Sequence, residues 1–362
     1  MIIQRKALMN VLSALFPVMG KGDDNPCNMI TVFADTENNW YMGAKNNRVA
    51  MMLPLCFKME QGFKVHGLTF FQLIKKLNCE ELDITVNGNT LSVKTDIPSE
   101  TSFELVQSGR TMLDFMSSID SEFKELPIDF MEGLKECVKY TDTDSTSILQ
   151  YVYMDKDLMA SANSSEIFIY KMEGVMDKMF IASEDISILS TMNLKEYTYQ
   201  DALLYFRTEG GAFVVVRPAS RKERFPVLLT KEDYTHIEQI NMKGLTPEVL
   251  FDLTDTRKLV FTEDECKHIS DIVKSCQAFT GTDGEFSCKF DGYDMCITGK
   301  GRKGTHKQQI KLTEFVSPIS FETKPELFLD LLERKDTMYI GKGKVIIVND
   351  KTKHLIQVSV GY

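Results

Sequence analysis

The sequence predicts an α+β fold made of three repeated modules, each with two helices packed on β-sheets. Three observations support this prediction. Amphipathic helical patterns recur at residues 6–19, 130–140 and 264–276, alternating apolar runs typical of strands follow each of them, and a second short helical pattern comes next every time. The same order of elements occurs three times, so the repeat has the size of a domain rather than of a short solenoid unit.

The remaining elements keep this order in every module. The second helices are expected at residues 68–77, 183–192 and 324–333. Strands are expected between the two helices of each module at 29–52, 146–171 and 285–311, and after the second helix at 82–94, 202–217 and 337–360. In the third module, Asp291-Gly292-Tyr293-Asp294 predicts a hairpin turn between two alternating runs, because Asp-Gly favours tight turns.

Each first helix has an apolar stripe and a polar face. In the first module, Leu8, Leu12 and Leu15 recur at helical spacing, whereas Arg5 and Lys6 lie off the stripe. Two short helices can cover only one face of the sheets, so strand edges remain to be paired. We expect pairing between successive modules or between subunits, which gives an arc that stays open or closes with a symmetric partner.

Two polar stretches divide the chain. They lie at residues 117–125 and 230–243, between the end of one module and the first helix of the next. We therefore expect three domains, at 1–118, 119–235 and 236–362.

Composition limits the class of protein. The chain has 362 residues, of which 43% are hydrophobic and 26% charged, as is usual for a soluble globular protein. No apolar run approaches the roughly 20 residues that span a bilayer, so we expect a cytoplasmic protein with no membrane contact. The net charge of −10 argues against holding nucleic acid by bulk electrostatic attraction. It does not argue against a protein that encircles a duplex and is retained by topology.

The sequence offers no catalytic or metal-binding constellation. The eight cysteines form no Cys-x-x-Cys pair, and we expect them to be buried reduced thiols. Residues 299–305 imitate a phosphate-binding loop, but they lack its lysine and lie between strands. The acidic pairs lie in loops, where Asp is an ordinary turn former, and the five histidines are dispersed. We expect no enzyme activity, no metal and no cofactor.

Three further segments carry a family resemblance. They are the turn and strand of residues 160–167 (ASANSSEI), Arg224-Phe225-Pro226 near the end of the second module, and the alternating apolar strand at the C-terminus. With the three modules, they make the chain similar to the bacterial DNA polymerase III beta subunit, the sliding clamp. We interpret it as a divergent member and expect a bacteriophage or another mobile element as its source.

The resemblance implies a half-ring that pairs with a second copy. The homodimeric ring of six similar domains would enclose double-stranded DNA without sequence preference, with helices lining the hole and sheets outside. Such a clamp has no chemistry of its own. It acts as a processivity factor in DNA replication, because it tethers a DNA polymerase and other partners, the clamp loader among them, through a short apolar peptide motif.

The resemblance also implies a partner-peptide pocket between the second and third domains. Carried over residue by residue, the pocket consists of Ile148, Leu149, Ala162, Ser164, Ser165, Ile167, Pro226, Leu228, Leu229, Leu327, Ile356, Val358, Val360 and Tyr362. Apolar side chains with a few polar neighbours suit a peptide-anchoring cleft. The family has Gly-His-Arg at 164–166, an aromatic residue at 327 and Met-Pro-Met at 358–360, so we expect a different partner motif here.

Cations on the helices are candidates for mobile contacts with DNA phosphates, which position a duplex without reading its bases. The candidates are Arg5, Lys6, Lys21, Lys75, Lys76, Lys135, Lys139, Lys195, Lys267 and Lys274. A solvated helix face is the alternative for each of them taken singly. A β-rich structural or self-assembly protein without DNA function is the alternative for the whole chain, and the recurrence of lysines on the helices favours the clamp.

Overall fold

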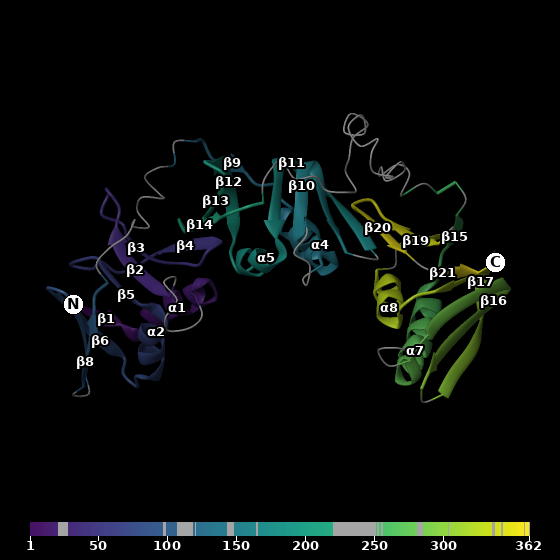
Figure 1. The fold of residues 1–362 in the computed structure, drawn as a ribbon, viewed down its shortest axis with the longest axis horizontal. Coiled ribbons are helices and arrows are strands. Elements are labelled where there is room, and N and C mark those ends of the chain that lie inside the picture. The colour runs from purple at the N-terminus through teal and green to yellow at the C-terminus, as the bar shows by residue number, and fades with distance from the viewer. Residues whose placement is uncertain are drawn as a thin grey trace. The chain divides into compact units, whose positions relative to one another are not determined.

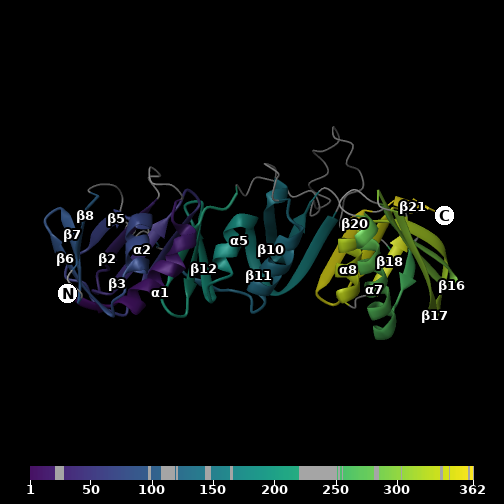
Figure 2. The ribbon, with the colours of Figure 1, turned by 90° about the horizontal axis from the view of Figure 1, so that it is seen from below.

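The computed structural model describes residues 1–20, 28–96, 99–106, 119, 121–142, 148–163, 166–219, 251, 253–254, 256–280, 285–302, 304–334, 337–341, 343–357 and 359–361, with the backbone alone for 357 and 359–361. The fold is α+β, as predicted, and four sheets and six α-helices lie in this part of the chain. The chain divides into two compact units, Met1–Met131 with Met179–Ser220, and Glu132–Lys178 with Arg221–Tyr362. Figures 1 and 2 show the elements of each unit.

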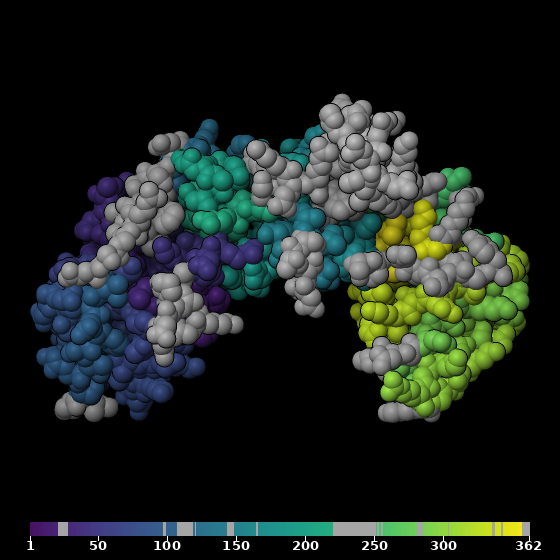
Figure 3. All heavy atoms as spheres, in the orientation of Figure 1, coloured from purple at the N-terminus to yellow at the C-terminus, as the bar shows by residue number. Residues whose placement is uncertain are grey.

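Unit 1 contains two sheets and the helices that cover them. The four-stranded sheet has the order β1 (Ile2–Gln4), β6 (Glu81–Asn87), β7 (Thr90–Thr95), β8 (Glu100–Glu104). The eight-stranded sheet has the order β5 (Phe63–His66), β2 (Met29–Ala34), β3 (Trp40–Lys45), β4 (Val49–Pro54), β14 (Phe213–Val216), β13 (Leu203–Thr208), β12 (Leu194–Gln200), β9 (Lys124–Glu125). Figure 3 draws the atoms of residues 28–96 in purple and blue.

The eight-stranded sheet joins the first module to the second. Strand β14 pairs antiparallel with β4, with Val214 opposite Met51 and Val215 opposite Ala50. The predicted pairing of edges between successive modules is therefore confirmed here. The three-domain division itself stays a prediction, because the expected boundaries adjoin or fall within residues outside the described part.

The helices of unit 1 form where their apolar stripes predict them. Helix α1 (Arg5–Leu15) buries Leu8, Leu12 and Leu15, and the 3₁₀ turn η1 (Phe16–Val18) extends it. Helix α2 (Gly67–Lys76) lies beside α1 (Figure 2), and the rings of Phe16 and Phe71 stack at 4.7 Å between centroids. Helix α5 (Ser183–Leu189) also belongs to this unit.

In its described residues, unit 2 also contains two sheets and three helices, and the end of its strand β11 extends into unit 1. Its six-stranded sheet has the order β10 (Tyr151–Ala162), β11 (Glu166–Ala182), β20 (Thr352–Gln357), β19 (Lys344–Val348), β18 (Thr337–Gly341), β15 (Arg257–Leu259). Its three-stranded sheet has the order β16 (Glu285–Gly301), β17 (Gly304–Glu322), β21 (Ser359–Gly361). The helices are α4 (Phe130–Cys137), which begins in unit 1 and continues into the 3₁₀ turn η2 (Val138–Tyr140), α7 (Glu263–Thr280) and α8 (Pro325–Glu333).

The predicted hairpin at Asp291-Gly292-Tyr293-Asp294 is wrong. Strand β16 continues through this segment, and its register with β17 shifts between Phe290 and Gly292 and again between Gly292 and Asp294. Gly292 has φ +70°, which glycine adopts without a steric penalty. The segment is therefore a β-bulge, for which Asp-Gly is as suitable as for a turn. The pairing of β16 with β17 instead runs on to Gly301, which lies opposite Gly304.

Close packing holds α7 against β16. A Cβ atom on Gly299 would lie 2.7 Å from the Cβ of Cys276, and one on Gly301 would lie 2.0 Å from the Phe279 carbonyl oxygen. Only a residue without a side chain allows this approach. The buried core below it contains residues of α7, α8 and both sheets, among them Ile269, Phe290 and Ile356.

The seven described cysteines are free thiols. Cys137, Cys276 and Cys288 are buried, and burial raises the pKa of each thiol. The expectation of burial is wrong for Cys56, which is exposed. Among the described residues, no helix is long and apolar enough to cross a membrane.

Candidate functional site

The first candidate surface is formed by the cations on the helices of unit 1. Lys6, Lys75 and Lys76 are exposed. Arg5 has a structural role, because its Nε donates to the Ile74 carbonyl at 2.9 Å and its terminal nitrogen donates to the Lys75 carbonyl at 2.8 Å. These carbonyls end α2 without helical partners. The guanidinium thus joins the start of α1 to the end of α2.

The other predicted cations have more acidic surroundings. Lys135 is exposed on α4, and Lys267 and Lys274 are exposed on α7. Lys139, at the end of η2, forms an ion pair with Glu136 at 2.9 Å. An ion-paired lysine has less charge to offer a phosphate.

Of the two remaining predicted cations, one lies on a strand and the other lies outside the described residues. Lys195 is exposed on strand β12, after α5. Lys21 lies outside the described residues.

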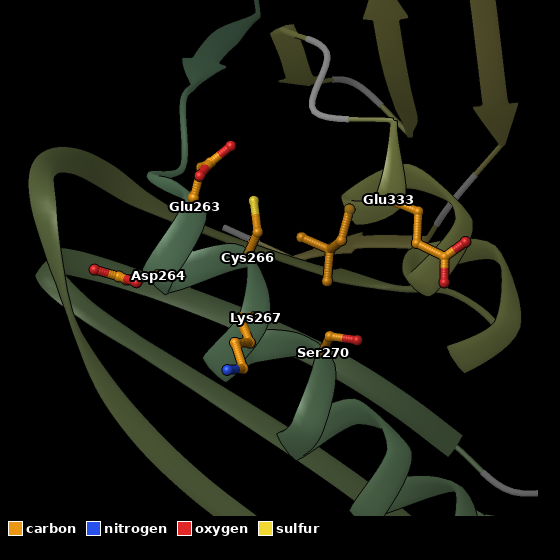
Figure 4. A pocket seen from close by; sticks show the side chains of 7 residues that line it. Glu263, Asp264, Cys266, Lys267, Ser270 and Glu333 are labelled. Atoms are coloured by element: carbon orange, nitrogen blue, oxygen red, sulfur yellow. The ribbon is translucent and has the colours of Figure 1, made fainter.

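Carboxylates dominate a hollow of about 440 Å³ between α7 and α8. Glu263 and Asp264 lie on the first turn of α7 and Glu333 ends α8, and Cys266 lies between Glu263 and Glu333 in Figure 4. Lys267 contributes a cation to the same lining. Because carboxylates repel phosphates, this surface of unit 2 is unfavourable for DNA.

The second candidate surface is the predicted peptide pocket, of which six residues are fully described. All six belong to unit 2: Ile148, Leu149, Ala162, Ile167, Leu327 and Ile356. Val360 is described by its backbone alone, in β21. The remaining predicted pocket residues lie outside the described part: Ser164, Ser165, Pro226, Leu228, Leu229, Val358 and Tyr362.

The six fully described pocket residues come from five elements, η3, β10, β11, α8 and β20. Ile148 and Leu149 form the half-buried 3₁₀ turn η3 (Ile148–Gln150), and the Leu149 carbonyl accepts the Asp142 N–H at 3.0 Å. Ala162 is buried at the end of β10. Leu327 is half-buried on α8 and packs against the core of unit 2.

The register of β11 and β20 separates two of the predicted pocket residues. Ile167 lies opposite Leu355, and Glu166 lies opposite Ile356. Directly opposed residues share a face of the sheet, and successive residues alternate between faces. Ile167 therefore shares its face with Leu355, whereas Ile356 lies on the other face, buried at 1% exposure in the core. Leu355 is the neighbour that the sequence reasoning missed.

A buried polar cluster occupies the face of Ile356. His354 Nε2 lies 3.0 Å from Glu166 Oε2, with exposures of 0% and 7%. The ring of Tyr140 stacks on Phe168 at 4.6 Å and lies 4.4 Å from His354. The Tyr140 hydroxyl donates to Asp330 at 2.9 Å. The cluster joins β11 to β20 and η2 to α8, next to the predicted pocket.

The charge state of this cluster follows from burial. Burial lowers the pKa of His354, against the attraction of Glu166. A carboxylate only accepts hydrogen bonds, so Nε2 of the neutral imidazole carries the proton and donates it. His354 Nδ1 has no hydrogen-bond partner among the described residues. This pair could not be predicted from a local pattern, because its members are 188 residues apart in the chain.

No group of three or more His, Cys, Asp or Glu side chains in the described part of the chain could hold a metal ion. The segment that imitates a phosphate-binding loop belongs to β16, β17 and their turn, rather than to a helix N-terminus.

The elements, their order and their pairing define an α+β fold of the beta sliding-clamp class, and the chain has this fold in common with a DNA polymerase sliding clamp from Bacillus subtilis. Three solved structures illustrate the likeness. A DNA polymerase sliding clamp from Caulobacter crescentus matches 99% of this chain and 98% of its own, with a TM-score of 0.77 and 11% identity. A putative DNA polymerase III beta subunit from Eubacterium rectale covers the same shares, with a TM-score of 0.76 and 14% identity.

The third structure is a Helicobacter pylori beta clamp bound to a DNA ligase peptide. It matches 99% of each chain, with a TM-score of 0.75 and 9% identity. No protein-family model and no curated protein sequence matches the chain. The expected bacteriophage source finds no support in these comparisons, since the structures named are bacterial.

Proposed function

We propose that this chain is a DNA sliding clamp. Two copies form a ring around double-stranded DNA and tether a replicative DNA polymerase and a clamp loader through a short peptide motif. The observation that carries the proposal is the likeness of fold along 99% of the chain to proteins solved as sliding clamps. The function needs neither catalysis nor a cofactor, and it belongs in the cytoplasm with the replication machinery. Three domains, at 1–118, 119–235 and 236–362, are part of the proposal.

Strand edges support the proposed homodimer. Among the described strands, β8 ends the four-stranded sheet and β16 ends the three-stranded sheet. An edge strand offers unpaired N–H and C=O groups to another chain. We propose that β8 of one copy pairs with β16 of the other, because two such contacts close a symmetric pair without leaving either edge free.

Apolar side chains support the proposed peptide site. Ile167 is half-buried and adjoins Leu355 on one face of the six-stranded sheet, and Leu327 is half-buried on α8. Partly exposed apolar side chains of this kind anchor short peptide motifs. The clamp from Helicobacter pylori was solved with a peptide of DNA ligase, which is consistent with such a use of the fold.

Light scattering at micromolar concentration tests the proposal. A closed ring of two copies requires twice the 41.3 kDa of the single chain. A monomer at this concentration would contradict the ring. A large open-ended assembly would favour the structural alternative, in which edges pair for self-association alone.

A further inference from the structure

Charge is distributed unevenly over the six described helices. Helices α1 and α2 carry four cations, Arg5, Lys6, Lys75 and Lys76, and no carboxylate. Helices α7 and α8 carry seven carboxylates against two lysines. Helix α5 has no cation, and α4 has two carboxylates and one lysine. A duplex is therefore attracted by the helix pair α1 and α2 and repelled by the helix pair α7 and α8.

The four cations of α1 and α2 form a single surface, which we name the α1–α2 cationic face. The bonds from Arg5 to the Ile74 and Lys75 carbonyls fix the start of α1 against the end of α2. Lys6 follows Arg5 directly, and Lys75 and Lys76 occupy the last turn of α2. The face thus brings together residues that are about seventy positions apart in the chain.

Three of these cations are exposed and have no ion-pair partner in the described part of the protein. Lys6, Lys75 and Lys76 are exposed, and none forms an ion pair with a described residue. Lys75 Nζ lies over the ring of Phe71, 5.8 Å from its centre, and the side chain stays exposed. Lys6 also opposes the helix dipole, since cations are unfavourable in the first turn of a helix. Helix stability does not account for a lysine there.

The nearest carboxylates along the chain do not cancel this face. Glu80 and Glu81 follow α2, at the start of strand β6. Glu81 accepts a hydrogen bond from Gln4 at 2.9 Å. The Glu80 carbonyl accepts the Arg5 N–H at 2.9 Å, so both glutamates lie beside the start of α1, and two carboxylates against four cations leave this surface net positive.

The cations of the other helices are accompanied by acids. Lys267 lines the hollow of Figure 4 together with Glu263, Asp264 and Glu333. Lys139 is paired with Glu136. The exposed carboxylates of α7 and α8 leave these surfaces net negative, so a phosphate gains little there.

We propose that the DNA contacts of this protein are concentrated on the α1–α2 cationic face, which binds backbone phosphates of a duplex, and that α7 and α8 make no attractive contact with DNA. The proposal rests on the proposed clamp function and narrows its ten candidate cations. The binding is independent of base sequence, because lysine side chains reach phosphates as point charges. The negative surfaces of α7 and α8 repel the duplex. The duplex is therefore not bound at unit 2, and the ring can slide along it.

Fluorescence anisotropy with a fluorescein-labelled duplex, titrated by the full chain at several salt concentrations, tests the proposal without a loader. The variant Lys6→Gln/Lys75→Gln/Lys76→Gln removes three cations of the face. The matched control Lys135→Gln/Lys267→Gln/Lys274→Gln removes three exposed lysines of α4 and α7. The two variants have the same net charge, so a difference between them reports position alone.

We expect the first variant to bind the duplex on the order of tenfold more weakly at low salt, and the slope of log K against log salt to shrink by about 2–3. The control should change affinity less than about twofold. Replacing the three lysines of the face by arginine should preserve binding, since the charge remains. Light scattering and circular dichroism check that each variant keeps its assembly and fold.

Three results would overturn the inference. They are equal losses in the two glutamine variants, a larger loss in the control, and binding of the unaltered chain to phosphatidylglycerol vesicles but not to the duplex at low salt. None of these results bears on whether the chain forms a dimer, which light scattering decides separately. The failure of this inference and the failure of the clamp function are therefore distinguishable.

Discussion

His354 and Glu166 form a buried pair between two strands that the chain order places far apart. The imidazole Nε2 lies 3.0 Å from the carboxylate Oε2, and the exposures are 0% and 7%. The pair bridges β20 and β11, whose hydrogen-bonded ladder builds the centre of the six-stranded sheet. Buried polar pairs contribute to a unique arrangement when each group is satisfied, and they are costly when one partner is removed.

The stability of the protein should fall in mild acid because of His354. Its pKa is lowered from the ordinary 6.5, chiefly by burial. The folded state thus binds a proton less readily than the unfolded state, so this contribution to stability is full above about pH 6.5 and is lost as the pH falls through the lowered pKa. Urea denaturation from pH 7.5 to 5.0 should show this loss in the unaltered chain and a smaller one in His354→Asn.

The groups that face His354 act in both directions. Burial and Arg334 lower the pKa of His354, whereas Glu166 and Asp330 raise it, and burial is the largest of these causes. Burial also raises the pKa of Asp330 from 3.8, which opposes the loss of stability in acid, but Asp330 is present in both chains, so the comparison with His354→Asn isolates the histidine. His268, exposed on α7, gives a control in His268→Gln. Equal pH slopes for His354→Asn and the unaltered chain would dismiss the role of the pair.

Much of this fold could be predicted from sequence because helical stripes are local. Leu8, Leu12 and Leu15 mark α1 within eleven residues, and all three are buried as expected. The hairpin turn predicted from Asp291-Gly292 was wrong. The same dipeptide suits a turn and a β-bulge, and the pairing of β16 with β17 decides between them.

The face on which a pocket residue lies could not be predicted. It depends on the register of β11 with β20, where Ile167 meets Leu355 rather than Ile356. A shift of one residue would have exchanged the faces. No local pattern contains this information, because the two strands are joined only through the tertiary fold.

The ion pair of Arg48 with Asp185 should stabilise the junction of β4 and α5 in unit 1. The Arg48 terminal nitrogen lies 3.0 Å from Asp185 Oδ2, and the Asp185 side chain is 3% exposed. Asp185→Ala leaves a guanidinium without its buried partner. We expect the free energy of unfolding to fall by about 2–3 kcal/mol, below the 3–5 typical of a fully buried pair because Arg48 reaches solvent.

Glu184 supplies the matched control for this pair. It also bonds Arg48, at 2.6 Å, but its side chain is 64% exposed. Glu184→Gln should cost less than about 1 kcal/mol, as exposed ion pairs do. Denaturation of both variants by urea provides the comparison. A cost for Glu184→Gln as large as that for Asp185→Ala would show that burial is not the deciding factor.

Gly299→Ala should disturb the packing of α7 on β16. The added Cβ would meet the Cβ of Cys276 at 2.7 Å, and neither the helix nor the strand can move away without loss of contacts. We expect a destabilisation of about 1–3 kcal/mol, typical of overpacking. Gly210→Ala, whose Cβ would have its nearest neighbour at 3.9 Å, should be close to neutral. Thermal unfolding of the two variants would contradict this account if their midpoints were equal.

Ile167→Glu should remove partner binding without breaking the ring. The side chain is half-buried, so a carboxylate can be accommodated, but an apolar peptide would lose its contact and meet a charge. Primer extension by the replicative polymerase of the same organism, on nicked circular DNA, should lose its stimulation by the clamp. The molecular mass in solution should not change.

Val175→Glu is the control on the same strand. Val175 is 72% exposed on β11 and is not among the predicted pocket residues. This variant should stimulate the polymerase like the unaltered chain. Normal stimulation by Ile167→Glu would remove Ile167 from the proposed pocket, and loss in both variants would point to a general effect on β11.

The central claim is that the protein encloses double-stranded DNA as a ring. Its release from DNA after the DNA is linearised tests this claim most directly. The protein is assembled on a nicked circular plasmid with one restriction site, separated from free protein by gel filtration, and then treated with the restriction enzyme. A ring held by topology stays on the circle at a salt concentration that screens phosphate contacts, and it slides off once an end is created. Equal retention on the circular and the linear form would contradict the account, because the protein would then be holding DNA by a contact rather than by enclosing it.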